Sequence, residues 1–257
     1  VRVDLRTGRR ATTISVDGAV LAVTAGAGGL WALDDLQTLY RIDPARGRIT
    51  TRIALGTAAA YNIWIGSGSV WVTDDQGAQV VRVSPRRSAV AARINVGDGP
   101  ADIAFSGGRA LVIDHRDRTL YAIDLATNRS RLLATLGGDA PERLALLAGS
   151  LWVTGRGTGL LQVDPATGRT RRTIDIRGTG IDILTAAGAL WIPVRSAATD
   201  AGGFPTMSAL RRVSAGGHVT TAATAAGRVD VHGFAAAPGA VWIADTTGGA
   251  LYRIAAG

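Results

Sequence analysis

The sequence contains no cysteine and no lysine, and these two absences remove several kinds of chemistry. Without cysteine, the chain can form neither disulfide bonds nor thiolate metal sites, and it has no cysteine nucleophile. Without lysine, it has no residue for a Schiff base and none for the phosphate-binding lysine of a P-loop. All 28 basic residues are therefore arginines, and they give the chain a formal net charge of +8.

Glutamate and histidine are scarce as well, which limits acid–base catalysis. The only glutamate is Glu142, and the three histidines are His115, His218 and His232. A glycosidase that works with a pair of glutamates is excluded. Neither a Gly-x-Ser-x-Gly elbow nor a His-Glu-x-x-His motif occurs, so the common hydrolase and zinc-protease templates find no match.

Long hydrophobic runs are also missing, although apolar residues make up 47% of the chain. No run approaches the roughly 18 residues that a membrane-spanning helix needs, so we expect no membrane span in this chain. Val1 is not a start residue, and no segment with the character of a leader follows it. We therefore expect any targeting segment to lie outside the chain.

The strongest positive signal is a short phrase that recurs six times: a glycine, one or two turn residues, an apolar residue and then tryptophan. Successive copies are separated by 40, 40, 41, 39 and 51 residues. Propeller blades of four strands have this period, whereas leucine-rich repeats are shorter. The copies end at Trp31, Trp71, Leu111, Trp152, Trp191 and Trp242. Because the repeat runs from end to end, we expect residues 1–257 to form a single all-β domain, a six-bladed β-propeller with four-stranded blades.

The second copy shows how one blade is built. Apolar and β-branched residues alternate in four short segments, which are separated by turns rich in Gly, Asp and Pro. The segments are 62–65, 69–73, 79–83 and 90–94. Tryptophan on the second strand would fill the wedge between neighbouring blades. Leu111 replaces it in the third copy, so we expect that blade to be less well packed unless Phe105 fills the gap.

The chain ends suggest how the ring closes. The segment 11–16 has the pattern of a fourth strand without its own blade, and the last unit ends at residues 251–254 without a fourth strand. We expect these two segments to pair, so that the N-terminal strand closes the last blade. The surplus third-strand segment 1–4 leaves an alternative open, in which the parent protein has seven blades.

Two segments resemble a known repeat family. Residues 96–105 (VGDGPADIAF) and 68–74 (GSVWVTD) resemble the repeats of YVTN-type β-propellers. The Gly-x-Leu-Trp phrase is also similar to that of streptogramin B lyase-like propellers. The resemblance extends over essentially the whole chain. It implies a module of bacterial cell-envelope or secreted proteins, or a sensor domain attached to regulators. The lyase relatives act with a His and Glu pair and a magnesium ion at the mouth of the central channel.

We expect the site at one end of the first strands, where the loops after the second strands also arrive. Nine residues before each anchor stand Ala22, Asn62, Asp102, Arg143, Asp182 and Gly233, with His232 one step earlier. The loops add further polar groups, and an insert of about ten residues within 196–208 is predicted to form a flap. The predicted ligand-binding residues are Asn62, Asp74, Asp102, Asp114, Arg143, Arg156, Asp182, Arg195, Phe204 and His232.

A mixture of carboxylates and guanidinium groups suits a small polar ligand. We therefore predict a non-enzymatic recognition or sensor module that binds a protein or a small polar ligand, needs no cofactor, works as a monomer and lies outside the cytoplasm. Arginines near the turns between third and fourth strands carry no interleaved aromatics, so nucleic acid is not the expected partner. The alternative is a lyase- or lactonase-like enzyme with His115, Glu142 and His232 as acid and base groups, and with Mg²⁺ or Ca²⁺ held by Asn62, Asp102 and Asp182.

Overall fold

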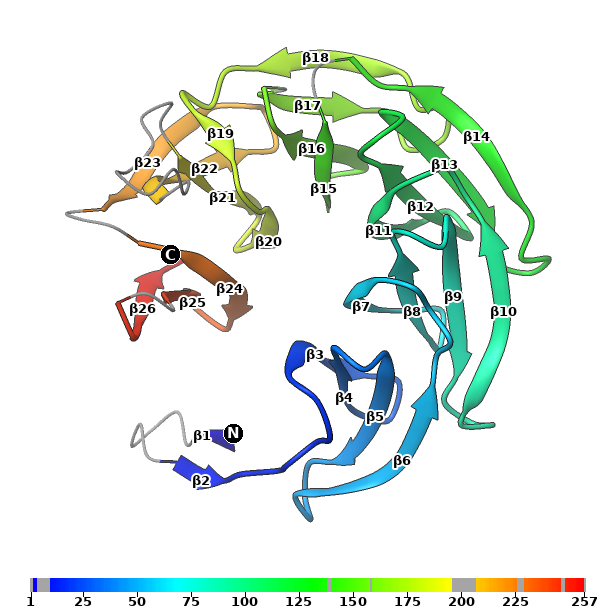
Figure 1. Ribbon diagram of the computed structural model, residues 1–257. Coiled ribbons are helices and arrows are strands. Elements are labelled where there is room, and N and C mark those ends of the chain that lie inside the picture. Colours follow the sequence, from blue (N-terminus) through cyan, green and yellow to red (C-terminus); the bar gives the residue numbers. More distant parts are fainter. Residues whose placement is uncertain are drawn as a thin grey trace. The chain divides into compact units, whose positions relative to one another are not determined.

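The computed structural model describes residues 2–3, 10–137, 140–157, 159–195, 207–225, 229–245 and 248–256. Within these ranges the chain consists of β-strands and turns, and there is no helix (Figure 1). A helix long and apolar enough to cross a membrane is accordingly not found among them.

The strands form six antiparallel sheets and one small hairpin, which we number in chain order. The hairpin consists of β1 (Arg2–Val3) and β2 (Arg10–Thr12). The first sheet contains β3 (Val20–Gly26), β4 (Gly29–Asp34), β5 (Thr38–Asp43) and β6 (Arg48–Ala54). The second sheet contains β7 (Ala60–Gly66), β8 (Ser69–Asp74), β9 (Gln79–Ser84) and β10 (Ala89–Asn95). The third sheet contains β11 (Pro100–Ser106), β12 (Arg109–Asp114), β13 (Thr119–Asp124) and β14 (Ser130–Thr135).

The last three sheets repeat this strand order with two variations. The fourth sheet contains β15 (Pro141–Leu147), β16 (Ser150–Gly155), β17 (Leu160–Val163) and β18 (Thr170–Ile174). In the fifth sheet the first strand is split, and the strands are β19 (Thr179–Gly180), β20 (Leu184–Ala186), β21 (Ala189–Arg195), β22 (Met207–Ser214) and β23 (Val219–Thr224). The sixth sheet has three strands, β24 (Val231–Ala237), β25 (Ala240–Asp245) and β26 (Ala250–Ala255). The six sheets are the blades of an all-β, six-bladed β-propeller, as the repeat predicts.

The contacts divide the chain into two compact units. The first contains residues 1–110 and 122–131, and the second contains residues 111–121 and 132–257. The hairpin and the first two sheets belong to the first unit, whereas the last three sheets belong to the second. The boundary between the units runs through the third sheet.

Most of the repeated tryptophans are buried and bonded in one way. Trp31, Trp71, Trp152 and Trp191 are at most 2% exposed. Each indole Nε1 donates a hydrogen bond to the carbonyl oxygen of the residue five positions earlier, at 3.0 to 3.3 Å. In the first unit, Trp31 packs against apolar side chains of the second sheet, and in the second unit Trp152 packs against those of the fifth. These tryptophans fill the wedges between successive blades, as predicted.

Phe105 does not fill the place that tryptophan leaves at Leu111. It packs in the wedge between the second and third sheets, where its ring lies 5.7 Å from that of Trp71 at an angle of 57°. A Cβ atom on Gly66 would come within 2.4 Å of this ring, so the glycine provides the space that Phe105 occupies. Leu111 is itself fully buried.

The pairing of the chain ends differs from the expected one. In the described residues, β2 pairs with β1 and places Arg2 opposite Thr12, while β26 pairs only with β25. The segment 11–16 that we expected beside residues 251–254 is therefore joined, through β2, to its sequence neighbour. A hairpin between nearby segments closes a short loop, which costs less conformational entropy than closing a long one.

Candidate functional site

The first strands carry a bulge where we predicted the site. Bulges re-aim side chains and are frequent beside functional sites. The fifth sheet is interrupted at the same place, between β19 and β20, and Asp182 lies in the interruption. In the other sheets for which the register is known, the shift falls between Val20 and Ala22, Ala60 and Ile63, Pro141 and Arg143, and Val231 and Gly233. The position nine residues before each anchor thus coincides with a local break in the strand ladder.

Three of the predicted site residues make the same local hydrogen bond at this position. The side-chain Oδ1 of Asn62 accepts the backbone N–H of Ile63 at 3.1 Å. Asp102 and Asp182 do the same with the residues that follow them, each at 2.7 Å. Because one oxygen is held by the adjacent N–H, the direction of each side chain is set by the backbone of the bulge.

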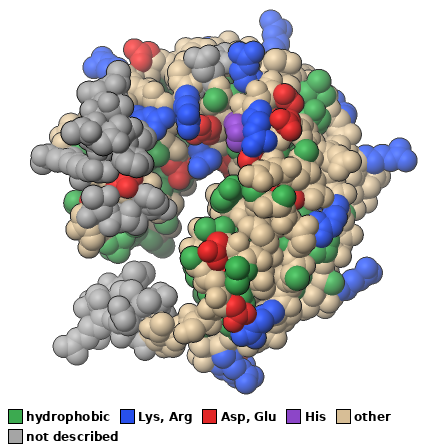
Figure 2. Space-filling model, viewed as in Figure 1, with side chains coloured by type: hydrophobic (Ala, Val, Ile, Leu, Met, Phe, Trp, Pro, Cys, Tyr) green, Lys and Arg blue, Asp and Glu red, His purple; other side chains and the backbone are tan. Residues whose placement is uncertain are grey.

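In the second unit, four charged side chains come together at the bulge, and we refer to Glu142, Arg143, Arg156 and Asp182 as the charged cluster. Arg143 Nε lies 3.9 Å from Asp182 Oδ1, and Arg156 Nε lies 3.0 Å from Glu142 Oε1. Arg143 Nη1 also donates a hydrogen bond to the backbone carbonyl of Glu142 at 3.1 Å. Figure 2 shows acidic and basic side chains interleaved in the upper middle of the molecule, over β15 and β16.

The Arg143 and Asp182 side chains are partly shielded from water, at 34% and 36% exposure. Desolvation raises the pKa of Asp182, while the charge of Arg143 and the hydrogen bond from Ile183 N–H act in the opposite direction. The separation of 3.9 Å makes this a loose ion pair, so an anion that reached Arg143 would compete with Asp182 for the guanidinium group.

Asp74 and Asp114 lie elsewhere, because both are completely buried. Asp74 Oδ1 accepts backbone N–H groups from Ala58, Ala59 and Gly77 at 2.9 to 3.2 Å, and its Oδ2 accepts the side-chain amide of Gln79 at 2.8 Å. Asp114 Oδ1 accepts N–H groups of its own loop at 2.8 and 2.9 Å. Contrary to our prediction, these two carboxylates hold the loops that follow the second strands.

The sequence analysis missed this structural role, although a signal for it exists. Asp34 and Asp245 end the second strands of their sheets in the same way, and both are buried acceptors of backbone N–H groups. A glycine stands three residues after Asp74 and after Asp245. A Cβ atom on Gly77 would come within 2.0 Å of Asp74 Oδ2. The spacing Asp-x-x-Gly after a second strand therefore indicates a carboxylate turned back into its own loop.

The other predicted residues are placed as follows. Arg195 ends β21, where it is half-buried, and His115 directly follows Asp114 in the loop after β12. Phe204 and most of the predicted flap lie outside the described residues, as does the side chain of His232. No three His, Asp or Glu side chains that could hold a metal ion come together among the side chains that the structure describes. These side chains therefore do not form the magnesium site that the resemblance implies.

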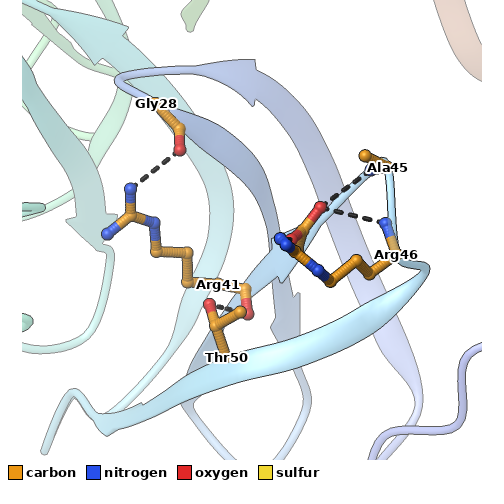
Figure 3. Close-up of polar contacts among 6 residues, drawn as sticks. Gly28, Arg41, Ala45, Arg46 and Thr50 are labelled. Carbon is orange, nitrogen blue, oxygen red and sulfur yellow. Dashed lines mark hydrogen bonds and ion pairs between the residues drawn. The ribbon is translucent and has the colours of Figure 1, made fainter.

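The arginines near the turns between third and fourth strands are partly paired with carboxylates of the same turns. Asp43 accepts the backbone N–H groups of Ala45 and Arg46 and the guanidinium of Arg46, the last at 2.7 Å (Figure 3). Asp164 binds the guanidinium of Arg171 at 2.6 Å in the corresponding turn. These pairs reduce the positive charge that a polyanion would meet at the two turns.

Comparison with known proteins gives a fold and no family. No family model and no curated protein matches the sequence. Solved structures are similar over nearly the whole chain. A hydrazine synthase structure from Kuenenia stuttgartiensis has a TM-score of 0.78 at 15% identity and covers 96% of this chain and 80% of its own. Virginiamycin B lyase from Staphylococcus aureus has a TM-score of 0.77 at 16% identity and covers 93% and 85%. The chain has a β-propeller fold.

A third similar structure extends this likeness to a different class of propeller. The WD40 propeller domain of Doa1 has a TM-score of 0.73 at 12% identity and covers 94% of this chain and 79% of its own. Propellers with a synthase, a lyase and a WD40 domain among them share the scaffold without sharing an activity. The likeness therefore supports the predicted fold, whereas the YVTN type of its repeats stays a prediction.

Proposed function

We propose that this propeller is a non-enzymatic recognition module that binds a small polar ligand with an anionic group at the charged cluster. The observation that carries the proposal is the contact between Arg143 and Asp182, because both side chains stand at a break in a first strand and both are only partly shielded. Polar groups that converge at a bulge, on a rigid sheet, are suited to orienting a ligand.

The chemistry of the cluster favours an anionic group on the ligand. An arginine side chain has five N–H donors in a planar fork, which matches a carboxylate. Arg156 is 70% exposed and is therefore accessible to a ligand, and Arg143 lies beside it through the shared neighbour Glu142. Glu142 and Asp182 would accept hydrogen bonds from hydroxyl or amino groups on the same ligand.

Titration with simple carboxylates tests this proposal. We expect acetate, succinate and citrate to raise the melting temperature and release measurable heat, with the di- and tricarboxylates more effective than acetate. Arg143→Ala should weaken binding about tenfold or more, because it removes a charge-assisted contact. Arg86→Ala, at an exposed arginine of the turn after β9, is the matched control and should leave binding unchanged. Equal binding by all three proteins would contradict the proposal.

A second candidate function is the lyase- or lactonase-like enzyme with a divalent metal. It is supported by the likeness of fold to virginiamycin B lyase and to a streptogramin B lyase, at 16% and 15% identity. Repeating the melts with Mg²⁺ and Ca²⁺ in place of carboxylates separates the two candidates. Stabilisation by the metal that is abolished by Glu142→Gln would favour the enzyme. A location outside the cytoplasm remains a proposal that rests on the resemblance of the repeats.

A further inference from the structure

The first unit contains an apolar cavity, separate from the charged cluster, of about 500 Å³. Its floor is the face of the first sheet that carries Val23, Leu30, Ala32 and Ile42, and one wall is the segment 12–16 that follows β2. The cavity is accessible from outside, since Val20 and Val23 at its rim are 50% and 57% exposed. Apolar surface of this kind is uncommon on a blade face, because the next wedge along the chain is closed.

The wedge between the first and second sheets shows what normally fills such a space. There, Ile53, Leu55, Ile63, Val70, Val72 and Val83 surround Trp31 and Leu33, and all of them are buried. Each of the six surrounding residues has a counterpart in the cavity at the same place of the repeat. These counterparts are Ile14, Val16, Val23, Leu30, Ala32 and Ile42. Among the lining residues, Trp31 and Leu33 have no counterpart.

The hairpin supplies a second, independent observation. Its strands β1 and β2 pair as the third and fourth strands of a blade do, and in the first sheet the strand on the far side of the third is β4, which carries Trp31 and Leu33. Within the residues that the structure describes, β1 pairs with β2 alone. Two-stranded sheets are only marginally stable in water, and a strand edge pairs readily with another strand.

We propose that this cavity is a docking site for an extended peptide strand that presents a tryptophan and, two residues later, an aliphatic side chain. The strand would add to the edge of β1, and its two side chains would occupy the places that Trp31 and Leu33 occupy in the next wedge. Recognition would thus combine main-chain hydrogen bonds with apolar pockets for alternate side chains, as in other cases of strand addition. The interface would continue an arrangement that already exists between the first two sheets.

A labelled peptide tests the proposal. The probe is the chain's own second-strand segment, residues 28–34 (GGLWALD), and binding to the full chain is followed by fluorescence anisotropy. We expect saturable binding, which replacement of the tryptophan in the peptide by alanine weakens about tenfold or more, since buried tryptophans dominate such interfaces. Binding should also be stronger than for a scrambled peptide of the same composition.

Two variants of the protein complete the test. Val23→Asp places a charge at the exposed rim of the cavity, and Val23→Trp fills the cavity from within, so both should weaken peptide binding about tenfold or more. Leu36→Asp is the matched control, because Leu36 is an exposed aliphatic residue, at 63%, that does not line the cavity. Absence of peptide binding to the unaltered chain, or equal binding by the Val23 variants and the Leu36 variant, would overturn the proposal. Either result would leave the charged cluster untouched.

Discussion

Individual residues of the repeat act mainly by bonding to the backbone. Four tryptophans donate to a carbonyl five residues earlier, and the aspartates that end four second strands accept backbone N–H groups of the neighbouring loops. Buried polar groups are costly unless they are hydrogen-bonded, so such residues are constrained in both chemistry and size. The same residue types would attract attention as ligands or catalysts if their burial were ignored.

Asp74 provides the sharpest test of this structural role. We expect Asp74→Ala to destabilise the protein by about 3 kcal/mol, because it leaves three backbone N–H groups and the Gln79 amide without their acceptor. Denaturant unfolding followed by circular dichroism measures the change. Asp117→Ala, at an exposed aspartate of the loop after β12, is the control and should stay within about 0.5 kcal/mol of the unaltered chain. Similar values for both variants would contradict the assignment.

At the level of whole elements, successive sheets are joined by arginines that reach the next turn. Arg41 of β5 donates to the carbonyl of Pro85, and Arg82 of β9 donates to the carbonyl of Leu125 and to Asn128 Oδ1, at 2.8 to 3.2 Å. In the fourth sheet Gln162 takes the place of Arg82, and Arg172 binds Gln162 while reaching the carbonyl of Gly216. The link is therefore kept although the residue that makes it changes.

Removing one of these links should loosen the contact between two sheets. We expect Arg82→Ala to cost about 2 kcal/mol, because it removes three hydrogen bonds and the placement of the guanidinium 4.9 Å from the Trp71 ring centre. Hydrogen exchange should report the loss at β9 and at the turn around residues 125–128. Arg87→Ala, an exposed arginine two turns of sequence away from no other sheet, serves as the control. If exchange rose equally in both variants, the link would have no special role.

For the molecule as a whole, charge is distributed in small local pairs. The turns between third and fourth strands hold Asp43, Asp124 and Asp164, and each carboxylate accepts two or more N–H or O–H donors of its own turn. The pKa of each is lowered. The guanidinium groups of Arg46 and Arg171 are the main cause for Asp43 and Asp164, and the hydrogen bonds from Thr127 are the main cause for Asp124.

These depressed values predict how stability depends on pH. A carboxyl group whose pKa is lower in the folded state stabilises that state above the unfolded pKa of about 3.9, and this contribution is lost as the pH falls through the folded value. For Asp164 the folded pKa is about 2. We therefore expect the melting temperature to fall between about pH 4 and pH 2. Asp182, whose pKa is raised, acts in the opposite sense.

The variant Asp164→Asn isolates one of these contributions. Its melting temperature should lie below that of the unaltered chain at pH 5, and the difference should shrink toward pH 2, where the native carboxyl group becomes protonated. Asp117→Asn provides the matched control, with no pH-dependent difference expected from an exposed aspartate. A difference for Asp164→Asn that stayed constant between pH 5 and pH 2 would be inconsistent with the lowered pKa.

Much of the fold could be predicted from residue spacing. In the second sheet the expected segments 62–65, 69–73, 79–83 and 90–94 fall inside β7, β8, β9 and β10. Strand periodicity and turn residues are local properties, so they can be recognised without a structure. The position nine residues before each tryptophan was also a good guide, since it coincides with the bulges.

The direction and burial of polar side chains could not be predicted in the same way. Asp74 and Arg156 both follow a second strand or end it, yet Asp74 is completely buried and Arg156 is 70% exposed. Which of the two can meet a ligand depends on whether a neighbouring loop offers N–H groups to the side chain. Such contacts join residues about 15 positions apart, and a pattern of single residues does not contain them.

The amino-acid sequence by itself determined the six-fold repeat, the all-β class and the kinds of chemistry that are absent, because these depend on spacing and composition alone. Only the tertiary structure decided that several predicted ligand aspartates are loop acceptors, that Arg143 meets Asp182, and that the first sheet keeps an apolar cavity. The reason is physical: burial and hydrogen bonding depend on which segments are brought together, and packing between distant parts of the chain settles that.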